Sequence, residues 1–186
     1  MPRQTRRIIV DHDANGKAIV TEDGPAPNVK LRQATGITST VLWVTDSSPP
    51  DISSAEDMSL RDVGVSPPAN GNILRIVDFP PVSEMQGVDN AAMLKEMGLS
   101  ADSHGGAASR SAFMHRTKSI DYAIVLEGEI DMLMDDTEVH LNTGDVLIQK
   151  ATNHAWVNNS KANCRIAFVL IDAVEPPAWK KSSGGH

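Results

Sequence analysis

Two histidines and one carboxylate are the residues of this chain with the clearest potential for chemistry. His115 precedes a strand-like run that carries Asp121, and a Gly-Asp turn at 144–145 opens a later run that His154 follows. Two imidazoles and one carboxylate with open coordination positions are typical of non-haem Fe(II) sites, and Mn, Ni, Cu or Zn also accept this set. The pattern therefore predicts a divalent transition metal as the cofactor, held by His115, Asp121 and His154.

Asp121 has two further roles open to it. Its carboxylate can accept a hydrogen bond from His115 and fix the tautomer of that imidazole instead of reaching the metal. In a pocket without metal, the carboxylate can act as a general base. The metal-free alternative leaves the cofactor absent. His115 and Asp121 are the candidate catalytic residues.

Three more side chains are candidates for a substrate pocket. Side chains two apart in a strand share a face, so Thr117 points the same way as His115, and Trp156 the same way as His154. Trp156 can form a wall against an aromatic or flat ligand. Gln149, which precedes the turn before His154, can hydrogen-bond a ligand.

The elements that must position these groups are strands. Tight turns separate the strand-like runs, and Asn15-Gly16 between two of them is a strong hairpin signal. Even spacing of short strands predicts an antiparallel sandwich or barrel. The expected strands cover residues 7–10, 17–20, 40–45, 73–79, 121–134, 138–141, 146–149, 156–158 and 164–172.

The segments between and after these strands differ in kind. Residues 46–72 are rich in Ser, Pro, Asp and Gly, which predicts a long surface excursion without a core of its own. Asp89 and Gly98 can cap one short helix. The Gly/Ala/Ser-rich stretch at 100–111 predicts a mobile loop, and residues 176–186 a flexible tail.

The stretch around His115 resembles the first motif of the cupin superfamily, which reads roughly G-x5-H-x-H-x3,4-E-x6-G. Gly128 matches the final Gly, and Asp121, separated from it by the six-residue spacer, stands at the Glu position. His115 falls on the first His and Thr117 on the second. Thr117 therefore leaves a gap where cupins usually place a third imidazole, and Asp121 is one methylene shorter than the expected ligand.

A later stretch resembles the second cupin motif, which reads roughly G-x5-P-x-G-x2-H-x3-N. Gly144 begins it, and His154 and Asn158 keep the spacing of its last two residues. The Pro and the tight-turn Gly of the motif are both replaced, and Ala151 or Thr152 is nearest to the Gly position.

The resemblance implies an all-β fold, a cupin jelly-roll β-barrel with extra N-terminal strands and one short helix. Residues 1–80 would supply N-terminal strands and the surface excursion, to the same barrel or to a dimer partner. Residues 81–111 would contain the helix and loop, 112–175 the barrel core and 176–186 the tail, all within one structural domain. Because cupins commonly pair through their sheets, a homodimer is expected.

The resemblance also favours a function. It implies a metal-dependent enzyme that acts on an organic small molecule bearing an enolate, phenol or carboxylate, by oxygenation or by isomerisation or decarboxylation. One alternative is a metal-free acid-base enzyme of the dehydratase or epimerase type. The other is a non-catalytic cupin that binds a small ligand.

Composition limits the partners. A net charge of -7 disfavours nucleic acid and anionic membranes, and no apolar run approaches the ~20 residues that span a bilayer. The start of the chain lacks the apolar region of a secretory signal, and its single cysteine, Cys164, permits no internal disulfide. We therefore expect a cytoplasmic protein whose partner is a small-molecule substrate, with no nucleic acid and no membrane.

Overall fold

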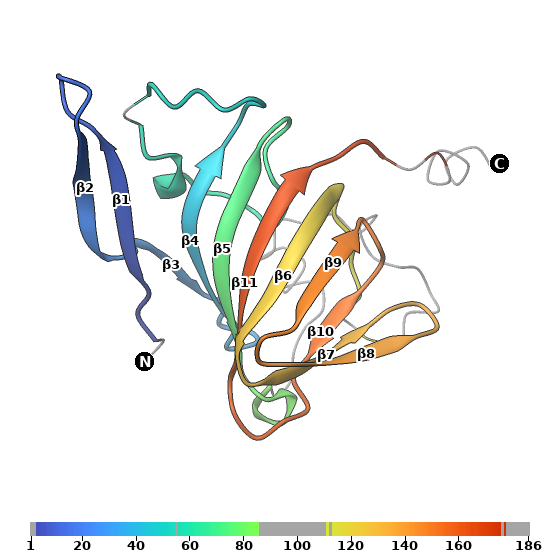
Figure 1. The fold of residues 1–186 in the computed structure, drawn as a ribbon. Helices are drawn as coiled ribbons and strands as arrows, with labels where there is room; N and C mark the ends of the chain where they lie inside the picture. Colours follow the sequence, from blue (N-terminus) through green and yellow to red (C-terminus); the bar gives the residue numbers. More distant parts are fainter. Residues whose placement is uncertain (1–2, 55, 86–110, 112, 176, 178–186) are drawn as a thin grey trace.

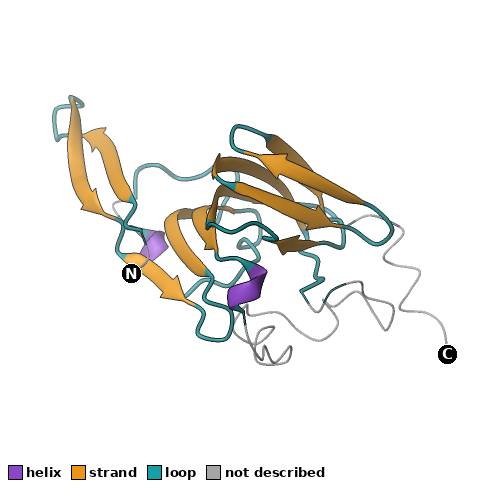
Figure 2. Cartoon of the chain, turned by 90° about the horizontal axis from the view of Figure 1, so that it is seen from below, coloured by secondary structure: helices purple, strands orange, loops and turns teal. Residues whose placement is uncertain are grey.

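Strands dominate the regular structure of the chain (Figure 1). The computed structural model describes residues 3–54, 56–85, 111, 113–175 and 177. In this part of the chain the helices are two short 3₁₀ turns, η1 (Met58–Leu60) and η2 (Val82–Glu84) (Figure 2). The strands are β1 (Arg6–His12), β2 (Ala18–Pro25), β3 (Asn28–Leu31), β4 (Thr38–Thr45), β5 (Asn72–Phe79), β6 (Ser119–Glu127), β7 (Glu129–Leu133), β8 (Glu138–Asn142), β9 (Val146–Lys150), β10 (Ala155–Val157) and β11 (Cys164–Asp172).

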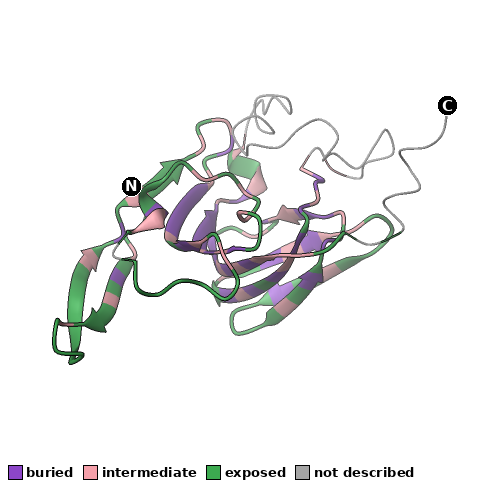
Figure 3. Cartoon of the chain, turned by 90° about the horizontal axis from the view of Figure 1, so that it is seen from above, coloured by how far each residue is buried: buried purple, intermediate pink, exposed green. Residues whose placement is uncertain are grey.

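The strands form two facing antiparallel sheets and a separate hairpin. The larger sheet has the order β3-β4-β5-β11-β6-β9 and the smaller one the order β10-β7-β8, whereas β1 and β2 form a hairpin that projects from the body (Figure 1). Ile73, Ile166 and Phe168 of the larger sheet share one apolar core with Ile130 and Leu141 of the smaller. Figure 3 shows the buried residues gathered between these sheets and the hairpin largely exposed. The all-β prediction is confirmed, and β3 to β5 belong to the same sheet as the later strands.

The alternation along β6 brings candidate site residues to the inner face of the larger sheet. Ser119, Asp121 and Ala123 are buried, whereas the residues between them are half-buried or exposed. Asp121 stands opposite Leu170 of β11 on one side and Gln149 of β9 on the other. The register therefore places a carboxylate and a carboxamide next to each other inside the fold.

Two strand details differ from the sequence prediction. The run at 121–134 is two strands, because Gly128, with φ +80°, turns the chain between β6 and β7. A Cβ at Gly128 would lie 2.7 Å from the carbonyl oxygen of Asn163, so only glycine fits there. Strand β3 is absent from the prediction, because its four residues are too few for a recognisable alternation.

Ala151 occupies the tight turn before His154. Its φ of 53° lies in the left-handed region that glycine adopts most easily. Ala151, and not Thr152, therefore stands where the second motif has its Gly, at a cost of about 1 kcal/mol.

The long connection between β4 and β5 is anchored in the interior at one point. Ser59 in η1 is fully buried and accepts a hydrogen bond from Nη1 of Arg7 at 2.7 Å. Nη2 of Arg7 lies 2.7 Å from Oδ2 of Asp57 and 2.5 Å from Oε2 of Glu22. The surface excursion expected from composition is thus fastened to the β1–β2 hairpin.

Three expected segments fall outside the described residues. These are the short helix between Asp89 and Gly98, the loop at 100–111 apart from Ser111, and the tail at 176–186 apart from Pro177. None of the helices in the described part of the chain has the length and apolar character needed to cross a membrane.

Candidate functional site

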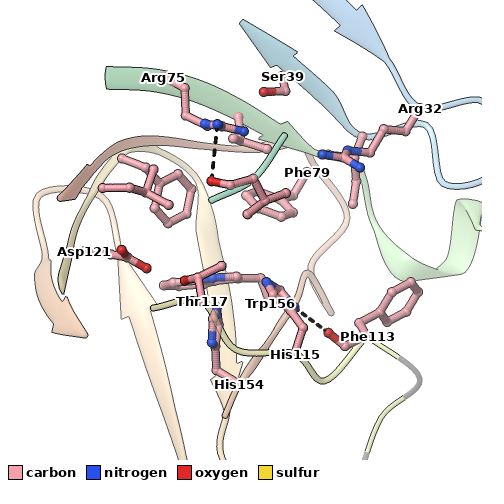
Figure 4. Close-up of a pocket in the computed structure, with 15 residues that line it drawn as sticks. Arg32, Ser39, Arg75, Phe79, Phe113, His115, Thr117, Asp121, His154 and Trp156 are labelled. Atoms are coloured by element: carbon pink, nitrogen blue, oxygen red, sulfur yellow. Dashed lines mark hydrogen bonds between the residues drawn. The ribbon is translucent and has the colours of Figure 1, made fainter. Parts of the chain in front are cut away.

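A cavity of about 100 Å³ lies against the inner face of the larger sheet (Figure 4). This is several times the space that one water molecule needs. The wall is mainly apolar and includes the aromatic rings of Phe79, Phe113, Trp156 and Phe168. Two imidazoles, one carboxylate, two guanidinium groups and the hydroxyls of one serine and one threonine also line it. An apolar cavity with a few polar groups is typical of small-molecule sites.

His115 and His154 are held together by the main chain. Each donates its N–H to the carbonyl oxygen of the other at 2.9 Å, in an isolated antiparallel bridge just ahead of β6 and β10. Directly paired residues project their side chains to the same face, and the two imidazole centres lie 4.5 Å apart. Both side chains are buried and line the cavity. The structure thus brings together the two imidazoles named from the sequence.

Main-chain carbonyls orient both imidazoles. Nδ1 of His115 lies 2.9 Å from the carbonyl oxygen of Phe113, and Nδ1 of His154 lies 3.0 Å from that of Thr152. A carbonyl only accepts, so in the neutral imidazole of His115 the hydrogen is on Nδ1 and the lone pair on Nε2. Burial, and then the neighbouring His115, lower the pKa of His154 to about 3. The imidazole of His154 is therefore neutral at pH 7.

Gln149 lies behind His154 and does not belong to the cavity wall. Its buried side-chain amide is 3.0 Å from Nδ1 of His154, and it is not among the residues that line the cavity. In this structure Gln149 contacts the imidazole of His154, and its contact with a ligand stays a prediction from the sequence.

Thr117 and Trp156 line the cavity, as strand parity predicts. The hydroxyl of Thr117 lies 2.8 Å from that of Ser119, so it is hydrogen-bonded within the protein. The ring of Trp156 meets those of His154 and Phe168 edge-on, with centres 6.1 and 5.4 Å away. Trp156 therefore stands between the imidazoles and the apolar wall.

Asp121 presents a buried carboxylate to the cavity from β6. Its Oδ1 has no hydrogen-bond partner among the described residues, which is costly for a buried charge. Burial raises the pKa of Asp121 to about 6, although Ser119 and the charge of Arg75 act in the opposite direction. Both protonation states are accessible near neutral pH, as an acid-base catalyst requires.

The donor set at the cavity fits a metal ion only in part. The two imidazoles have Nδ1 beside main-chain carbonyls, an arrangement common among metal-binding histidines. Within the described ranges, however, no three His, Cys, Asp or Glu side chains gather closely enough to hold a metal ion. Asp121 does not complete a set with His115 and His154 here, and the three-ligand site stays a prediction from the sequence.

Two arginines on the cavity wall are absent from the sequence prediction. Arg75 lies on β5, and Arg32 follows β3. With Ser39 of β4 they lie across the cavity from the imidazoles (Figure 4). The sequence does contain one indication of Arg75, which is an arginine inside the apolar run 73–79. Arginine is seldom fully buried unless it is paired, so its presence in such a run is unusual.

Two other residues with functional potential serve the fold. Asn158, the last residue of the second motif, is buried, and its Nδ2 donates to the carbonyls of Phe79 and Ala162, each at 2.8 Å. Cys164 is also buried, and burial is the main cause that raises its pKa to about 12. A thiol with so high a pKa is a poor nucleophile at neutral pH.

Comparisons with known proteins agree with these findings. A family model for the cupin domain matches residues 102–171. The chain is 32% identical over 180 residues to Phomopsin biosynthesis cluster protein C' of Diaporthe leptostromiformis, across 92% of this chain and 80% of that protein. It is 25% identical over 177 residues to the cupin-domain-containing oxidoreductase virC of Hypocrea virens, across 91% of this chain and 77% of that protein. The chain belongs to the cupin superfamily, and its all-β fold is the cupin jelly roll.

Proposed function

We propose that this chain is an enzyme that converts an organic small molecule with an enolate, phenolate or carboxylate group in the cavity beside His115 and His154. The main support is the convergence of reactive groups in an apolar cavity: two imidazoles fixed by the main chain and a carboxylate with an unpartnered oxygen. Ionisable groups with perturbed pKa values in a cleft are typical of catalytic sites. The relatives named cupin-domain-containing oxidoreductases also support an enzymatic role.

In the first form of the proposal, catalysis is proton transfer without a metal. Asp121 accepts a proton from the substrate, because its side chain lines the cavity and its Oδ1 has no hydrogen-bond partner among the described residues. His115 is a second proton acceptor, since its Nδ1 donates to a carbonyl and its lone pair is on Nε2. This pair serves isomerisation, dehydration or epimerisation, each of which begins with removal of a proton.

In the second form, His115 and His154 hold a divalent transition metal, with Asp121 as the third ligand expected from the sequence. The position of each Nδ1 beside a main-chain carbonyl favours this form, because it directs Nε2 away from the main chain. When bound, the metal would supply Lewis acidity and, for a redox-active ion, reactivity toward dioxygen. An oxidoreductase reaction would need such a group, because the thiol of Cys164 is buried away from the cavity wall.

Metal analysis of protein purified without chelator separates the two forms. The metal-dependent form predicts near-stoichiometric metal that is lost in His115→Ala and His154→Ala. The matched control, His140→Ala, removes an exposed imidazole from β8 and retains the metal. Protein that takes up no metal under any reconstitution condition contradicts the metal-dependent form. Metal that persists in Asp121→Ala makes this residue a base or a hydrogen-bond acceptor.

Turnover decides whether the chain is an enzyme at all. Oxygen uptake and product mass spectrometry are measured with diketones, phenols and carboxylic acids as substrates. Oxygen consumption indicates oxygenation, and an isomerised or dehydrated product without oxygen consumption indicates proton transfer. In the metal-free form, Asp121→Asn lowers the rate by about 10²-fold or more while ligands still bind. Ligands that bind without being converted support the non-catalytic alternative.

A further inference from the structure

One end of the cavity carries cationic and hydroxyl groups that the proposed function leaves unused. Arg75 and Ser39 come from neighbouring strands, β5 and β4. Ser39 stands opposite Val77, which is two residues from Arg75, so both side chains lie on the inner face. Arg32 lines the same end of the cavity (Figure 4).

Arg75 is a buried cation that has no ion pair with the carboxylates of the described residues. It is 5% exposed, and its Nη2 donates to the carbonyl oxygen of Gly64 at 2.6 Å, a group without formal charge. No ion pair among the described residues includes Arg75. Asp121 attracts it electrostatically without contact, and Arg32 repels it. Burying a cation without a paired anion costs free energy, and a bound anion would offset this cost.

Two hydrogen-bond donors at this end have no acceptor among the described residues. They are Nε of Arg75 and the hydroxyl of Ser39, both with almost no solvent contact. Buried donors without acceptors are uncommon, and each calls for a partner that the protein itself does not supply. Burial and the nearby charge of Arg32 lower the pKa of Arg75 to about 10, so the guanidinium stays positive at pH 7.

We propose that Arg75, Ser39 and Arg32 form an anion subsite that binds a carboxylate of the substrate. A guanidinium presents a planar fork that matches the two oxygens of a carboxylate. The body of the substrate then extends along Phe79 and Trp156 toward the imidazoles, which face it from the other side (Figure 4).

This inference rests on the proposed function and makes it more specific. Four aromatic rings belong to the cavity wall together with aliphatic side chains, so a flat or aromatic carboxylic acid fits it, with its reacting group beside His115 and His154. The carboxylate is an anchor at the arginine end, and the reacting enolate or phenolate is a separate group. A carboxylate that reacts at the imidazole end would not need the arginines.

Calorimetric titration with matched probe pairs tests the subsite. The probes are benzoate, 4-hydroxybenzoate and 2-naphthoate, each compared with its primary amide, with EDTA present so that no metal binds the carboxylate. We expect at least one carboxylate to bind about tenfold or more tightly than its amide, because a hydrogen bond to a charged group is the stronger kind. Equal affinities within every pair overturn the proposal.

Variants of the arginines test whether the preference for carboxylates over amides arises at the proposed subsite. Arg75→Gln should reduce the carboxylate preference to less than threefold, and Arg75→Lys should restore part of it. The control Arg6→Gln removes the same charge from an exposed site that pairs with Asp23, and should leave the preference unchanged. An unchanged preference in Arg75→Gln overturns the proposal. If this variant does not fold, Arg32→Gln takes its place under the same criterion.

The His115→Ala variant separates failure of the subsite from failure of the proposed function. It should keep the carboxylate preference, because the anchor lies at the other end of the cavity. Loss of the preference in His115→Ala with retention in the arginine variant moves the carboxylate to the imidazoles and overturns the subsite. Binding with the expected preference, but without turnover of any probe either in EDTA or after metal reconstitution, leaves the subsite standing and counts against the enzymatic function.

Discussion

The orientation of the His154 imidazole depends in part on a residue that does not line the cavity. Gln149 comes from β9, on the far side of β6 from β11, and its buried amide meets Nδ1 of His154 at 3.0 Å. The carbonyl oxygen of Thr152 lies at the same distance from the same atom. These two contacts fix the ring plane of His154, and with it the direction in which Nε2 points.

Gln149→Met should lower the free energy of unfolding by about 1 kcal/mol, because it replaces a buried amide by a side chain of similar length without the hydrogen bond. Urea denaturation followed by far-UV circular dichroism measures the change. The control Gln33→Met alters an exposed glutamine and should stay within about 0.5 kcal/mol of the wild type. Equal effects in the two variants would mean that the contact with His154 contributes nothing to stability.

Spacing predicted more of the imidazole end of the cavity than of the arginine end. His115, Thr117, His154 and Trp156 all line the cavity, because strand parity and two motifs determine where they point. Arg75 also lies on the inner face of its strand, but the sequence alone does not distinguish a buried arginine in an apolar strand from an arginine at the edge of a sheet. The environment of Arg75 depends on which strands pack beside β5, and the local sequence does not specify this tertiary arrangement.

Gly128 separates two strands at a point of close backbone approach. Gly128→Ala should cost at least about 2 kcal/mol, because it adds the strain of φ +80° to a Cβ 2.7 Å from the carbonyl oxygen of Asn163. Gly144→Ala is a matched control, since its φ is +94° with no atom within 4 Å of the added Cβ. Thermal unfolding of both variants measures the difference, and a cost for Gly144→Ala as large as for Gly128→Ala would contradict the role of the close approach.

The anchor of the β4–β5 connection should be sensitive to acid. Burial tends to raise the pKa of Asp57, but hydrogen bonds from Arg7 and Ser59 outweigh it and hold the pKa below its ordinary value of 3.8. A carboxyl whose pKa falls on folding stabilises the fold above its unfolded pKa, and this contribution disappears as the pH drops through the folded value. Asp57→Asn should therefore cost about 1 kcal/mol at pH 7 and progressively less as the pH falls below 3.8 through the folded pKa of Asp57.

Asparagine at position 57 keeps the cap of η1, where Oδ1 of Asp57 accepts from the N–H of Ser59 at 2.9 Å. The variant therefore keeps the cap and removes both the charge and the acceptor oxygen that face Nη2 of Arg7. Asp136→Asn, at an exposed turn, serves as the control in the same pH series of urea titrations. A cost for Asp57→Asn that does not depend on pH would show that Arg7 gains nothing from the charge.

At the level of elements, the sequence predicted most strands and placed their ends less well. The hairpin at Asn15-Gly16 and strands β4, β5 and β11 follow from turn residues and strand-like apolar runs. The division at Gly128 depends on the approach of Asn163, which belongs to a loop far away in the sequence. Contacts of this kind leave no local pattern, so the run 121–134 looked continuous.

The two facing sheets should unfold as one unit. Ile166 in the larger sheet and Ile130 in the smaller are both almost fully buried in the same core. Replacing either by alanine should cost about 3 kcal/mol, and circular dichroism and tryptophan fluorescence should report the same midpoint for each variant. Ile52→Ala, at a side chain 84% exposed, is the control. Separate transitions for the two sheets would contradict a single core.

At the scale of the whole molecule, the cupin fold could be predicted because two motifs agree at the right separation in one chain. The homodimer is a prediction of another kind, which rests on how cupins commonly associate. Light scattering on the purified protein measures it directly.

The bridge between His115 and His154 uses main-chain atoms only. The main chain therefore sets the distance between these two positions, whichever side chains they carry. Thr117 lines the same cavity at the position where the cupin motif has a second histidine. In evolutionary terms, a lineage can replace the chemistry at these positions one residue at a time without rebuilding the fold that presents it.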